Sequence, residues 1–421
     1  MDIDRILELD RQALDYIAPY TKTRFAFDEL EKTPGRPFLA LIGPRGVGKT
    51  ILLRQLRALY QDAIYISADT LGGIRSGGAV SLKEMIRSLH TSMGINRFFV
   101  DEIHFVPEYA AELKELYDFS QIQIWFTSSV ALSLYESSWD LSRRVRTARL
   151  GPLSLREYLS FRYDLELESL SLEKIFEGYL PVSHLRLSPY FEEYLRGGLY
   201  PFLLEAGSEF DQFFSIKEKI IHDDIPNFDR SINREDLSNI EKVLSFIGKS
   251  PVDGINYSSV AKNVGITKYR AEKYLDLLQR SFLLFLAFPK GTNVLKEPKV
   301  FMELPWRLLF RDYDECVGEL REDFFALAME QHGKSFFYLK TNRGQKTPDF
   351  FFEGKEIDGS DRSFVIEVGG KGKGRSQFKG ISYDKKIIVY HQGFGMLAPR
   401  KSPDDPQGKR VPLHILGFPG S

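Results

Sequence analysis

A glycine-rich segment near the N-terminus combines residue types that can hold phosphate groups. Residues 43–50 read GPRGVGKT, so four residues separate the first glycine from a terminal Gly-Lys-Thr. Glycines let backbone N–H groups turn inward around phosphates, the lysine can reach the β and γ phosphates of a nucleotide, and the threonine hydroxyl can hold Mg2+. The segment therefore predicts a nucleotide-binding loop. Its predicted contact residues are Gly43, Pro44, Arg45, Gly46, Val47, Gly48, Lys49 and Thr50.

Two adjacent carboxylates follow further along the chain. Asp101 and Glu102 come directly after the mainly apolar segment 97–100, which reads as a buried strand. At a nucleotide-hydrolysing site, the first acid after such a strand positions the Mg2+ shell, and the next acid can polarise the attacking water. We predict these two roles for Asp101 and Glu102. For His104, both a role in the site and a purely structural role stay open.

Small hydroxyl residues end a third predicted strand. Residues 127–129 are Thr-Ser-Ser and follow the apolar segment 122–126. Open α/β sheets hold their ligands at the carboxyl ends of the strands, so Ser128 is a candidate for touching the γ phosphate or orienting water. The alternative is that these hydroxyls cap the next helix.

Arginines between residues 142 and 149 can supply positive charge to a transition state, from the same chain or from a neighbouring subunit. Arg144 is the candidate from this group, and surface ion pairing is its alternative. The sequence carries no Asn-Lys-x-Asp guanine-reading motif, so adenine is the expected base. The expected cofactors are ATP and Mg2+.

The residues around the glycine-rich segment indicate the elements that position it. The apolar run 38–42 reads as a buried strand, and apolar residues recur at helical spacing from Thr50 onward. Together with the strands predicted at 97–100 and 122–126, this pattern indicates an α/β fold with a parallel sheet.

Composition excludes several classes of protein. The chain has 421 residues, 43% of them hydrophobic and 27% charged, with a mean hydropathy of -0.25. These values are typical of globular chains, and the length indicates roughly three domains. The longest apolar run, 282–288, is too short to cross a membrane, and the acidic start is unlike a signal peptide, so we expect a cytoplasmic protein and no membrane partner. The single cysteine, Cys316, allows no internal disulfide and is expected to be a small buried residue.

Charge is unevenly distributed along the chain. Residues 331–421 contain 16 Lys and Arg against 9 Asp and Glu, a net charge of +7, whereas the whole chain has a net charge of -1. A basic end on an acidic body indicates a nucleic-acid-facing module. A solvated positive face is the alternative.

The middle of the chain has the pattern of a helix-turn-helix. Residues 258–264 read as a short helix, Gly265 as a tight turn, and Thr267 as the cap of a second helix that runs to Leu278. An apolar segment suited to a wing strand follows. The second helix carries basic and aromatic side chains that could meet DNA phosphates, or could instead pack internally as a lid. These are Lys268, Tyr269, Arg270 and Lys273.

Together these segments resemble a prokaryotic AAA+ type ATPase family, close to the STAND class, whose members carry a winged helix and a C-terminal domain similar to PD-(D/E)XK nucleases. The resemblance covers nearly the whole chain. It rests on GPRGVGKT, FFVDEIH at 98–104, the TSS strand end, SRRVRTARLGPLSLREYL at 142–159, and Gly197-Gly198 with Pro201. Locally, Ser154 to Glu157 also reads as a capping box, and residues 197–201 as a turn.

The resemblance implies a P-loop NTPase parallel sheet, a helical lid, a winged helix and a C-terminal α/β PD-(D/E)XK-like domain. The implied domains are the ATPase core at 1–150, the lid at 151–230, the winged helix at 231–295 and the nuclease-like domain at 296–421. The GGLYP segment at 197–201 is similar to a family signature near the nucleotide or lid.

In the nuclease-like domain, the resemblance matches Glu322, Asp349 and Glu367 to the carboxylate positions, and implies that Asp349 and Glu367 hold Mg2+ or Mn2+. The sequence departs from the pattern at the lysine position, because residue 369 is glycine. Lys371, or Lys373, could enter from the glycine-rich loop that follows. Alternatively, the domain is kept only as a platform that binds nucleic acid or protein.

The expected function is thus an ATP-binding and ATP-hydrolysing AAA ATPase whose cycle repositions the winged helix and the nuclease-like domain, acting on or with DNA. The alternative is a STAND-like nucleotide switch whose inactive nuclease fold binds a protein partner. Oligomeric state stays open, and a homo-oligomer would allow Arg144 to act on a neighbouring subunit.

Overall fold

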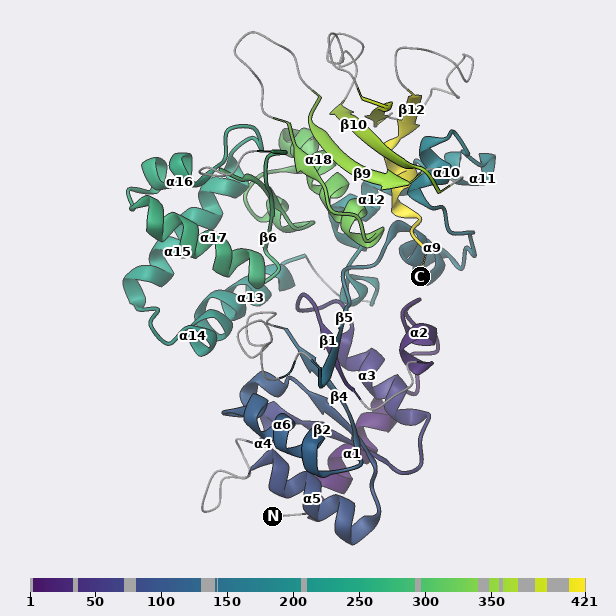
Figure 1. The fold of residues 1–421 in the computed structure, drawn as a ribbon, viewed down its shortest axis with the longest axis vertical. Coiled ribbons are helices and arrows are strands. Elements are labelled where there is room, and N and C mark those ends of the chain that lie inside the picture. The colour runs from purple at the N-terminus through teal and green to yellow at the C-terminus, as the bar shows by residue number, and fades with distance from the viewer. Residues whose placement is uncertain are drawn as a thin grey trace. The chain divides into compact units, whose positions relative to one another are not determined.

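The computed structural model describes residues 3–32, 37–71, 81–129, 141, 143–205, 210–291, 297–339, 348–355, 359–369, 383–391 and 409–420. The chain divides into two compact units, residues 1–152 and residues 153–420 (Figure 1). This division falls close to the predicted end of the ATPase core at residue 150. None of the described helices is long and apolar enough to span a membrane.

The first unit is built on a five-stranded sheet in the order β2-β3-β4-β1-β5, and all its neighbouring strands run parallel. The strands are β1 Phe38–Ile42, β2 Ala63–Ser67, β3 Arg97–Asp101, β4 Gln123–Ser128 and β5 Val145–Arg149. The parallel α/β sheet and the three predicted strands are confirmed. Because β1, β3 and β4 are adjacent, the loop after β1 and the acids after β3 emerge from the same edge of the sheet.

The helices of the first unit bury apolar faces against this sheet. They are α1 Ile3–Ile17, α2 Phe27–Glu31, α3 Lys49–Ala58, α4 Ala68–Leu71, α5 Leu82–Met93 and α6 Tyr109–Phe119, with a short 3-10 turn, η2, at Ile103–Phe105. A buried ion pair fixes α1 on α3, because Arg57 Nε lies 2.7 Å from Asp10 Oδ1. The same carboxylate accepts the backbone N–H of Tyr65, so α1, α3 and β2 meet at one polar contact.

The second unit begins with short helices. These are α9 Leu155–Tyr163, α10 Leu172–Phe176, α11 Val182–Leu185, α12 Tyr190–Glu193, the π-helical turn η3 Tyr194–Gly198, η4 Pro201–Leu204, α13 Gln212–Lys219, η5 Ile220–Asp224 and α14 Ile225–Phe228. The segment predicted as a turn at 197–201 is partly helical: η3 closes on Gly197, whose φ is +129°, and η4 begins at Pro201. The capping box is confirmed, since Ser154 accepts the Glu157 N–H and Glu157 accepts the Ser154 N–H.

This capping box gives a stability prediction. Ser154→Ala is expected to lower the free energy of unfolding of the second unit by about 1 kcal/mol, because a buried helix start loses its acceptor. Chemical denaturation followed by circular dichroism measures the change. Glu157→Gln is the matched control, since glutamine can keep the reciprocal bond and should stay close to wild type. Equal decreases in the free energy of unfolding of Ser154→Ala and Glu157→Gln would contradict the assignment of Ser154 as the helix cap.

Three helices and a strand pair follow. The helices α15 Arg234–Lys249, α16 Tyr257–Val264 and α17 Lys268–Arg280 precede the antiparallel strands β6 Leu284–Ala287 and β7 Lys299–Met302. The predicted helix, turn and second helix are confirmed. Gly265 ends α16 with φ +79°, and Thr267 caps α17 by accepting the Arg270 N–H. Because β7 pairs with β6, the strand pair crosses the boundary predicted between residues 295 and 296.

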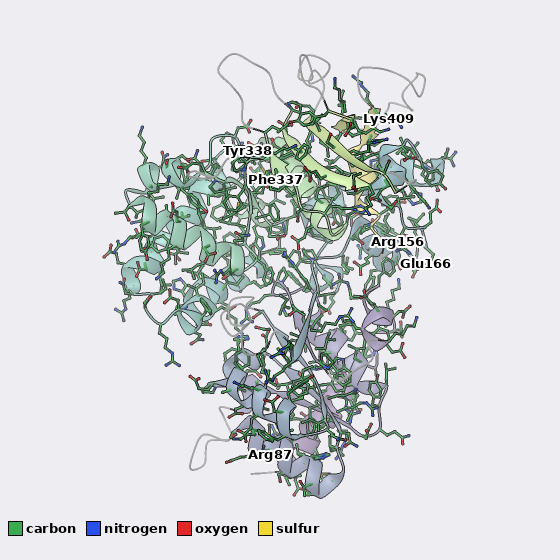
Figure 2. All side chains as sticks on the ribbon, in the orientation of Figure 1. Arg87, Arg156, Glu166, Phe337, Tyr338 and Lys409 are labelled. Atoms are coloured by element: carbon green, nitrogen blue, oxygen red, sulfur yellow. The ribbon has the colours of Figure 1, made fainter. Side chains whose placement is uncertain are left out.

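The C-terminal part holds a long helix, α18 Tyr313–Gln331, and a second five-stranded sheet in the order β12-β11-β10-β9-β8. Its strands are β8 Phe337–Tyr338, β9 Phe350–Lys355, β10 Asp361–Gly369, β11 Lys385–Tyr390 and β12 Lys409–Pro412, and 3-10 turns lie at η6 Trp306–Leu309 and η8 Leu413–Gly417. Strands β8, β9 and β10 form an antiparallel meander, whereas β10, β11 and β12 run parallel. Figure 2 labels Phe337 and Tyr338 on the edge strand β8.

Polar contacts hold α18 and the last strand in place. Arg307 and Asp323 form a fully buried ion pair with a 2.7 Å contact between Nε and Oδ2. Arg307 also donates to the Ile247 carbonyl of α15, so this pair joins α18 to the three-helix region. Lys409 at the start of β12 donates to the Glu177 carbonyl just after α10 (Figure 2). Cys316 is buried on α18 as predicted.

Candidate nucleotide-binding site

The glycine-rich loop joins β1 to α3 in the predicted strand, loop and helix order. Gly46 and Gly48 have φ values of +85° and +90°, which L side chains rarely adopt. Gly48 is the N-cap of α3, and no side chain occupies the cap. The first N–H groups of the helix and the positive end of its dipole therefore face the loop, an arrangement suited to phosphate.

Lys49 is already held at the loop. Its side chain is buried, and its Nζ donates to the Gly43 and Pro44 carbonyls at 2.8 Å each. A phosphate entering the loop would exchange these two carbonyls for charged oxygens. The loop is also held by Arg24, a buried residue that donates a hydrogen bond to the Val47 carbonyl oxygen at 2.7 Å. The sequence pattern gave no signal for Arg24, because its partners are carbonyls rather than a carboxylate.

Asp101 lies at the carboxyl end of β3 within a hydrogen-bond network. Tyr65 donates to its Oδ2 at 2.7 Å, Thr127 donates to its Oδ1, and Thr50 also hydrogen-bonds to it. Burial, and then the charge of Glu102, raise the pKa of Asp101 above its usual range. A buried carboxylate of this kind is stabilised by a cation, and the Thr50 hydroxyl beside it fits a magnesium site. The sequence did not indicate a role for Tyr65, because no motif follows its strand, β2.

Glu102 is held in an uncommon backbone conformation beside three cationic or dipolar groups. Its φ is +51°, which costs free energy for a residue other than glycine and is typical of functional sites. Its Oε2 accepts the Ser129 N–H and lies 3.2 Å from His104 Nδ1, and its Oε1 lies 3.8 Å from Arg45. Burial opposes ionisation, but the charges of Lys49, then His104 and Arg45, lower the pKa of Glu102. The carboxylate is thus ionised at neutral pH.

Ser128 and Arg144 lie in different surroundings. Ser128 ends β4 beside Ile42 of β1, is buried, and has its Oγ 3.4 Å from His104 Nδ1. Arg144 instead precedes β5, so it lies at the opposite edge of the sheet from the loop, and it binds both oxygens of Asp118 at 2.9 Å. The structure therefore does not bring Arg144 to the loop of its own chain. Arg149, at the carboxyl end of β5 beside Ile42, lies at the loop edge.

The carboxylates matched by the nuclease resemblance lie in the second unit. Glu322 is on α18, Glu367 is buried in β10, and Asp349 precedes β9 and accepts the Val368 N–H at 2.9 Å. Glu322 is ion-paired with Lys299 of β7 at 2.8 Å. Lys371 and Lys373 lie outside the described residues.

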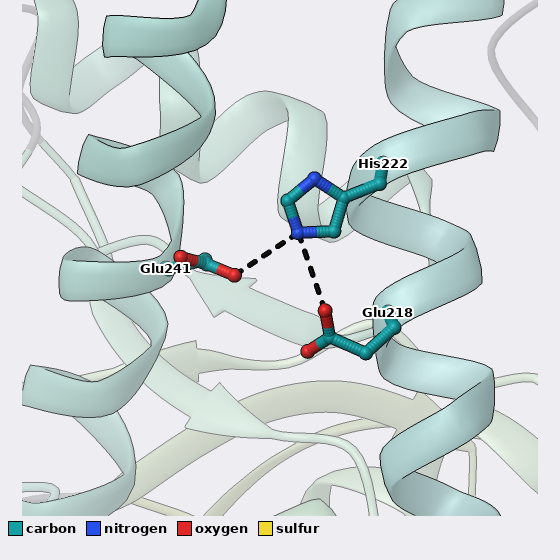
Figure 3. A group of neighbouring side chains, drawn as sticks. All are labelled: Glu218, His222 and Glu241. Carbon is teal, nitrogen blue, oxygen red and sulfur yellow. Dashed lines mark hydrogen bonds and ion pairs between the residues drawn. The ribbon is translucent and has the colours of Figure 1, made fainter.

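Within the described parts of the chain, the one trio of ligand-type side chains whose atoms approach within 4.8 Å of one another is a different group. It consists of Glu218, His222 and Glu241 (Figure 3). His222 Nε2 lies 3.3 Å from Glu218 and 3.1 Å from Glu241, so hydrogen bonds and ion pairing between α13, η5 and α15 account for this arrangement. Among the described residues, Glu322, Asp349 and Glu367 are not a second trio at this spacing.

The basic side chains of α17 are engaged within the second unit. Lys268 pairs with Glu297, Arg270 with Glu235 and Lys273 with Asp229. Tyr269, in contrast, is 76% exposed. A nucleic acid would have to compete with these carboxylates for the lysines and the arginine of the helix.

Comparisons with known proteins cover most of the chain. A family described as "AAA domain" matches residues 35–159, and one described as "Domain of unknown function (DUF8612)" matches residues 188–303. An uncharacterized protein of Methanocaldococcus jannaschii is 28% identical over 415 residues, which span 87% of this chain and 85% of the relative.

Two of the solved structures that match the chain do so at low TM-scores. The Aeropyrum pernix ORC1 protein in complex with DNA has a TM-score of 0.29 and 14% identity, covering 76% of this chain and 94% of its own. AMPPCP-bound DnaA from Aquifex aeolicus has a TM-score of 0.24 and 14% identity, covering 60% and 84%. The match at residues 35–159 spans the glycine-rich loop, both acids and Ser128, which ends β4. Residues 35–159 therefore match the AAA domain family, and they contain the five-stranded parallel sheet of the first unit.

Proposed function

We propose that the protein binds and hydrolyses Mg-ATP at the loop after β1. The observation that carries this proposal is the meeting of Lys49, Thr50 and Asp101 with an ionised Glu102 at one edge of the sheet. In this assignment Lys49 binds the β and γ phosphates, Thr50 and Asp101 hold the magnesium shell, and Glu102 accepts a proton from the attacking water. Bound Mg2+ would neutralise charge on the phosphates.

The residues around Glu102 suit that role. Its neighbours Lys49, His104 and Arg45 keep the carboxylate ionised despite burial. The Ser129 N–H and the left-handed backbone fix its direction. Ser128, at the end of the neighbouring strand, is assigned to contact the γ phosphate or to orient water. Arg144 is retained only as an arginine acting on a neighbouring subunit.

We further propose that the ATPase cycle repositions a winged helix and a nuclease-like C-terminal domain, and that the protein acts on or with DNA. Three helices followed by an antiparallel strand pair support the winged helix, which then spans about residues 231–302. A helix followed by a mixed sheet that starts as a meander supports the nuclease-like domain. The helical region that precedes them, residues 153–230, is assigned as the lid.

Two features of the second unit favour a second candidate. Residue 369 is glycine where the nuclease pattern has lysine, and Glu322 is neutralised by Lys299. Both features favour a nucleotide switch in which the nuclease fold is inactive and serves as a platform for DNA or a protein partner. In such a switch, ATP and ADP would set different conformations or assemblies.

The test is incubation of the purified protein with labelled single- and double-stranded DNA and Mg2+ or Mn2+, with ATP or ADP. We expect DNA binding that differs between the two nucleotides, and no cleavage. Cleavage that disappears in the Asp349→Ala, Glu367→Ala double variant would instead establish an ATP-linked nuclease. Identical sedimentation and DNA-binding profiles with ATP and ADP would contradict the switch.

A further inference from the structure

The carboxylate site, formed by Glu322, Asp349 and Glu367, includes a lysine from another element. Lys299 opens β7, and its side chain is 11% exposed. Its Nζ lies 2.8 Å from Glu322 Oε2 and 2.9 Å from Asp253 Oδ1. These two carboxylate contacts favour the charged form of the amine over its neutral form. The ammonium therefore stays protonated next to the acids.

Space for a small ligand lies directly beside this ion pair. A cavity of about 230 Å³ is lined by Asp253, Glu322 and Gly369, among others. Its wall thus includes one carboxylate of the site and the backbone position where the nuclease pattern has a lysine.

With the Lys299 ammonium in place, the arrangement of side chains does not fit a divalent ion. Mg2+ is bound by oxygen ligands at about 2.1 Å in near-octahedral geometry, so its protein ligands must lie close to one another. Glu322, Asp349 and Glu367 do not form such a trio in the described part of the chain. A dication on Glu322 would also lie only a few ångströms from the Lys299 ammonium, and the two charges would repel strongly in a buried setting.

We propose that Lys299 is the resident cation of the carboxylate site and takes the place that a divalent metal would occupy. The ammonium neutralises the charge of Glu322 and offsets the negative potential from Asp349. It also connects β7, which follows the three helices, to α18 and to the start of β9. This inference rests on the second candidate function above, in which the nuclease fold is inactive. It identifies Lys299 as the residue that keeps divalent ions out of the carboxylate site.

The test is Mn2+ binding to the nucleotide-free full-length chain, followed by the electron paramagnetic resonance signal of free Mn2+. All proteins carry His222→Gln, which removes the exposed trio of Figure 3 as a competing site. The variants are Lys299→Met, which keeps the length and removes the charge, and Lys299→Met with Glu322→Gln. Lys268→Met is the matched control, because Lys268 is also paired with a glutamate in the same region.

We expect Lys299→Met to gain one Mn2+ site that is at least about tenfold tighter than any in the parent, because the carboxylates lose their counter-ion. The double variant should lose that site, and Lys268→Met should gain none. Added Mn2+ should also raise the melting temperature of Lys299→Met alone. Folded Lys299→Met that binds no more Mn2+ than the parent would overturn the proposal.

Mn2+ binding by the parent protein provides a second, independent test of the proposal. If it already binds one Mn2+ that Glu322→Gln removes, then the carboxylates rather than Lys299 determine the cation, and the proposal is wrong even if Lys299→Met fails to fold. The double variant replaces a largely buried ion pair by neutral groups, a change that proteins often tolerate, so it serves as the folded reference. Because no nucleotide is present, loss of ATP turnover in the first unit would leave this measurement unaffected.

Discussion

Lys49→Ala is expected to abolish ATP turnover. The lysine ammonium is buried at the loop and fixed by the Gly43 and Pro44 carbonyls, so it meets the phosphates without first being ordered. A charge-assisted hydrogen bond contributes about 1.5–3 kcal/mol, so affinity for ATP should fall by roughly tenfold to a hundredfold. The substitution also removes the largest charge that lowers the pKa of Glu102, which impairs the chemical step as well.

The measurement is ATP binding by a fluorescent analogue together with phosphate release. Lys83→Ala is the matched control, since Lys83 lies in the same unit and is paired with Glu115 on α5 and α6 at 2.7 Å. That control should keep wild-type binding and turnover. Turnover at the wild-type rate in Lys49→Ala would refute the assignment of the loop.

The parts of the first unit that could be predicted are those with a local signal. Strand β1 is a continuous apolar run before a glycine-rich loop, and α3 has apolar residues at helical spacing. Strand β5 was missed because it is an edge strand with the polar sequence VRTAR and no fully buried residue. Strand β2 is apolar, but no motif follows it, so Tyr65 could not be connected to Asp101.

The roles that depend on distant partners could not be read from the sequence. Arg144 is a plausible transition-state group by its position in the chain, but its bidentate contact with Asp118 depends on how β5 and α6 pack. Lys299 carries no local pattern, and its pairing with Glu322 and Asp253 arises only when β7 folds beside α18. Spacing along the chain predicts motifs well, whereas side-chain pairing across elements requires the fold.

Glu102→Gln is expected to keep ATP binding while lowering turnover by about 10²- to 10⁴-fold, the usual contribution of a general base. Glutamine preserves the size of the side chain and can still accept the Ser129 N–H, but it cannot take a proton from water. The ATP dissociation constant should therefore stay close to wild type. Glu115→Gln, which alters an ion-paired surface carboxylate in the same unit, is the control and should leave both quantities unchanged.

The pH profile of the wild-type protein provides an independent check on this residue. Neighbouring positive charges lower the pKa of Glu102, so this base stays ionised as the pH falls through the ordinary glutamate range. With saturating Mg2+, which keeps Asp101 ionised, the fall in turnover at acid pH that Glu102 causes (the acid limb) should lie below about pH 4.3. Arg45→Ala removes one of those charges, so the limb should move to higher pH in that variant. A limb that does not move, combined with wild-type turnover in Glu102→Gln, would assign proton transfer to another group at the end of β3 or β4.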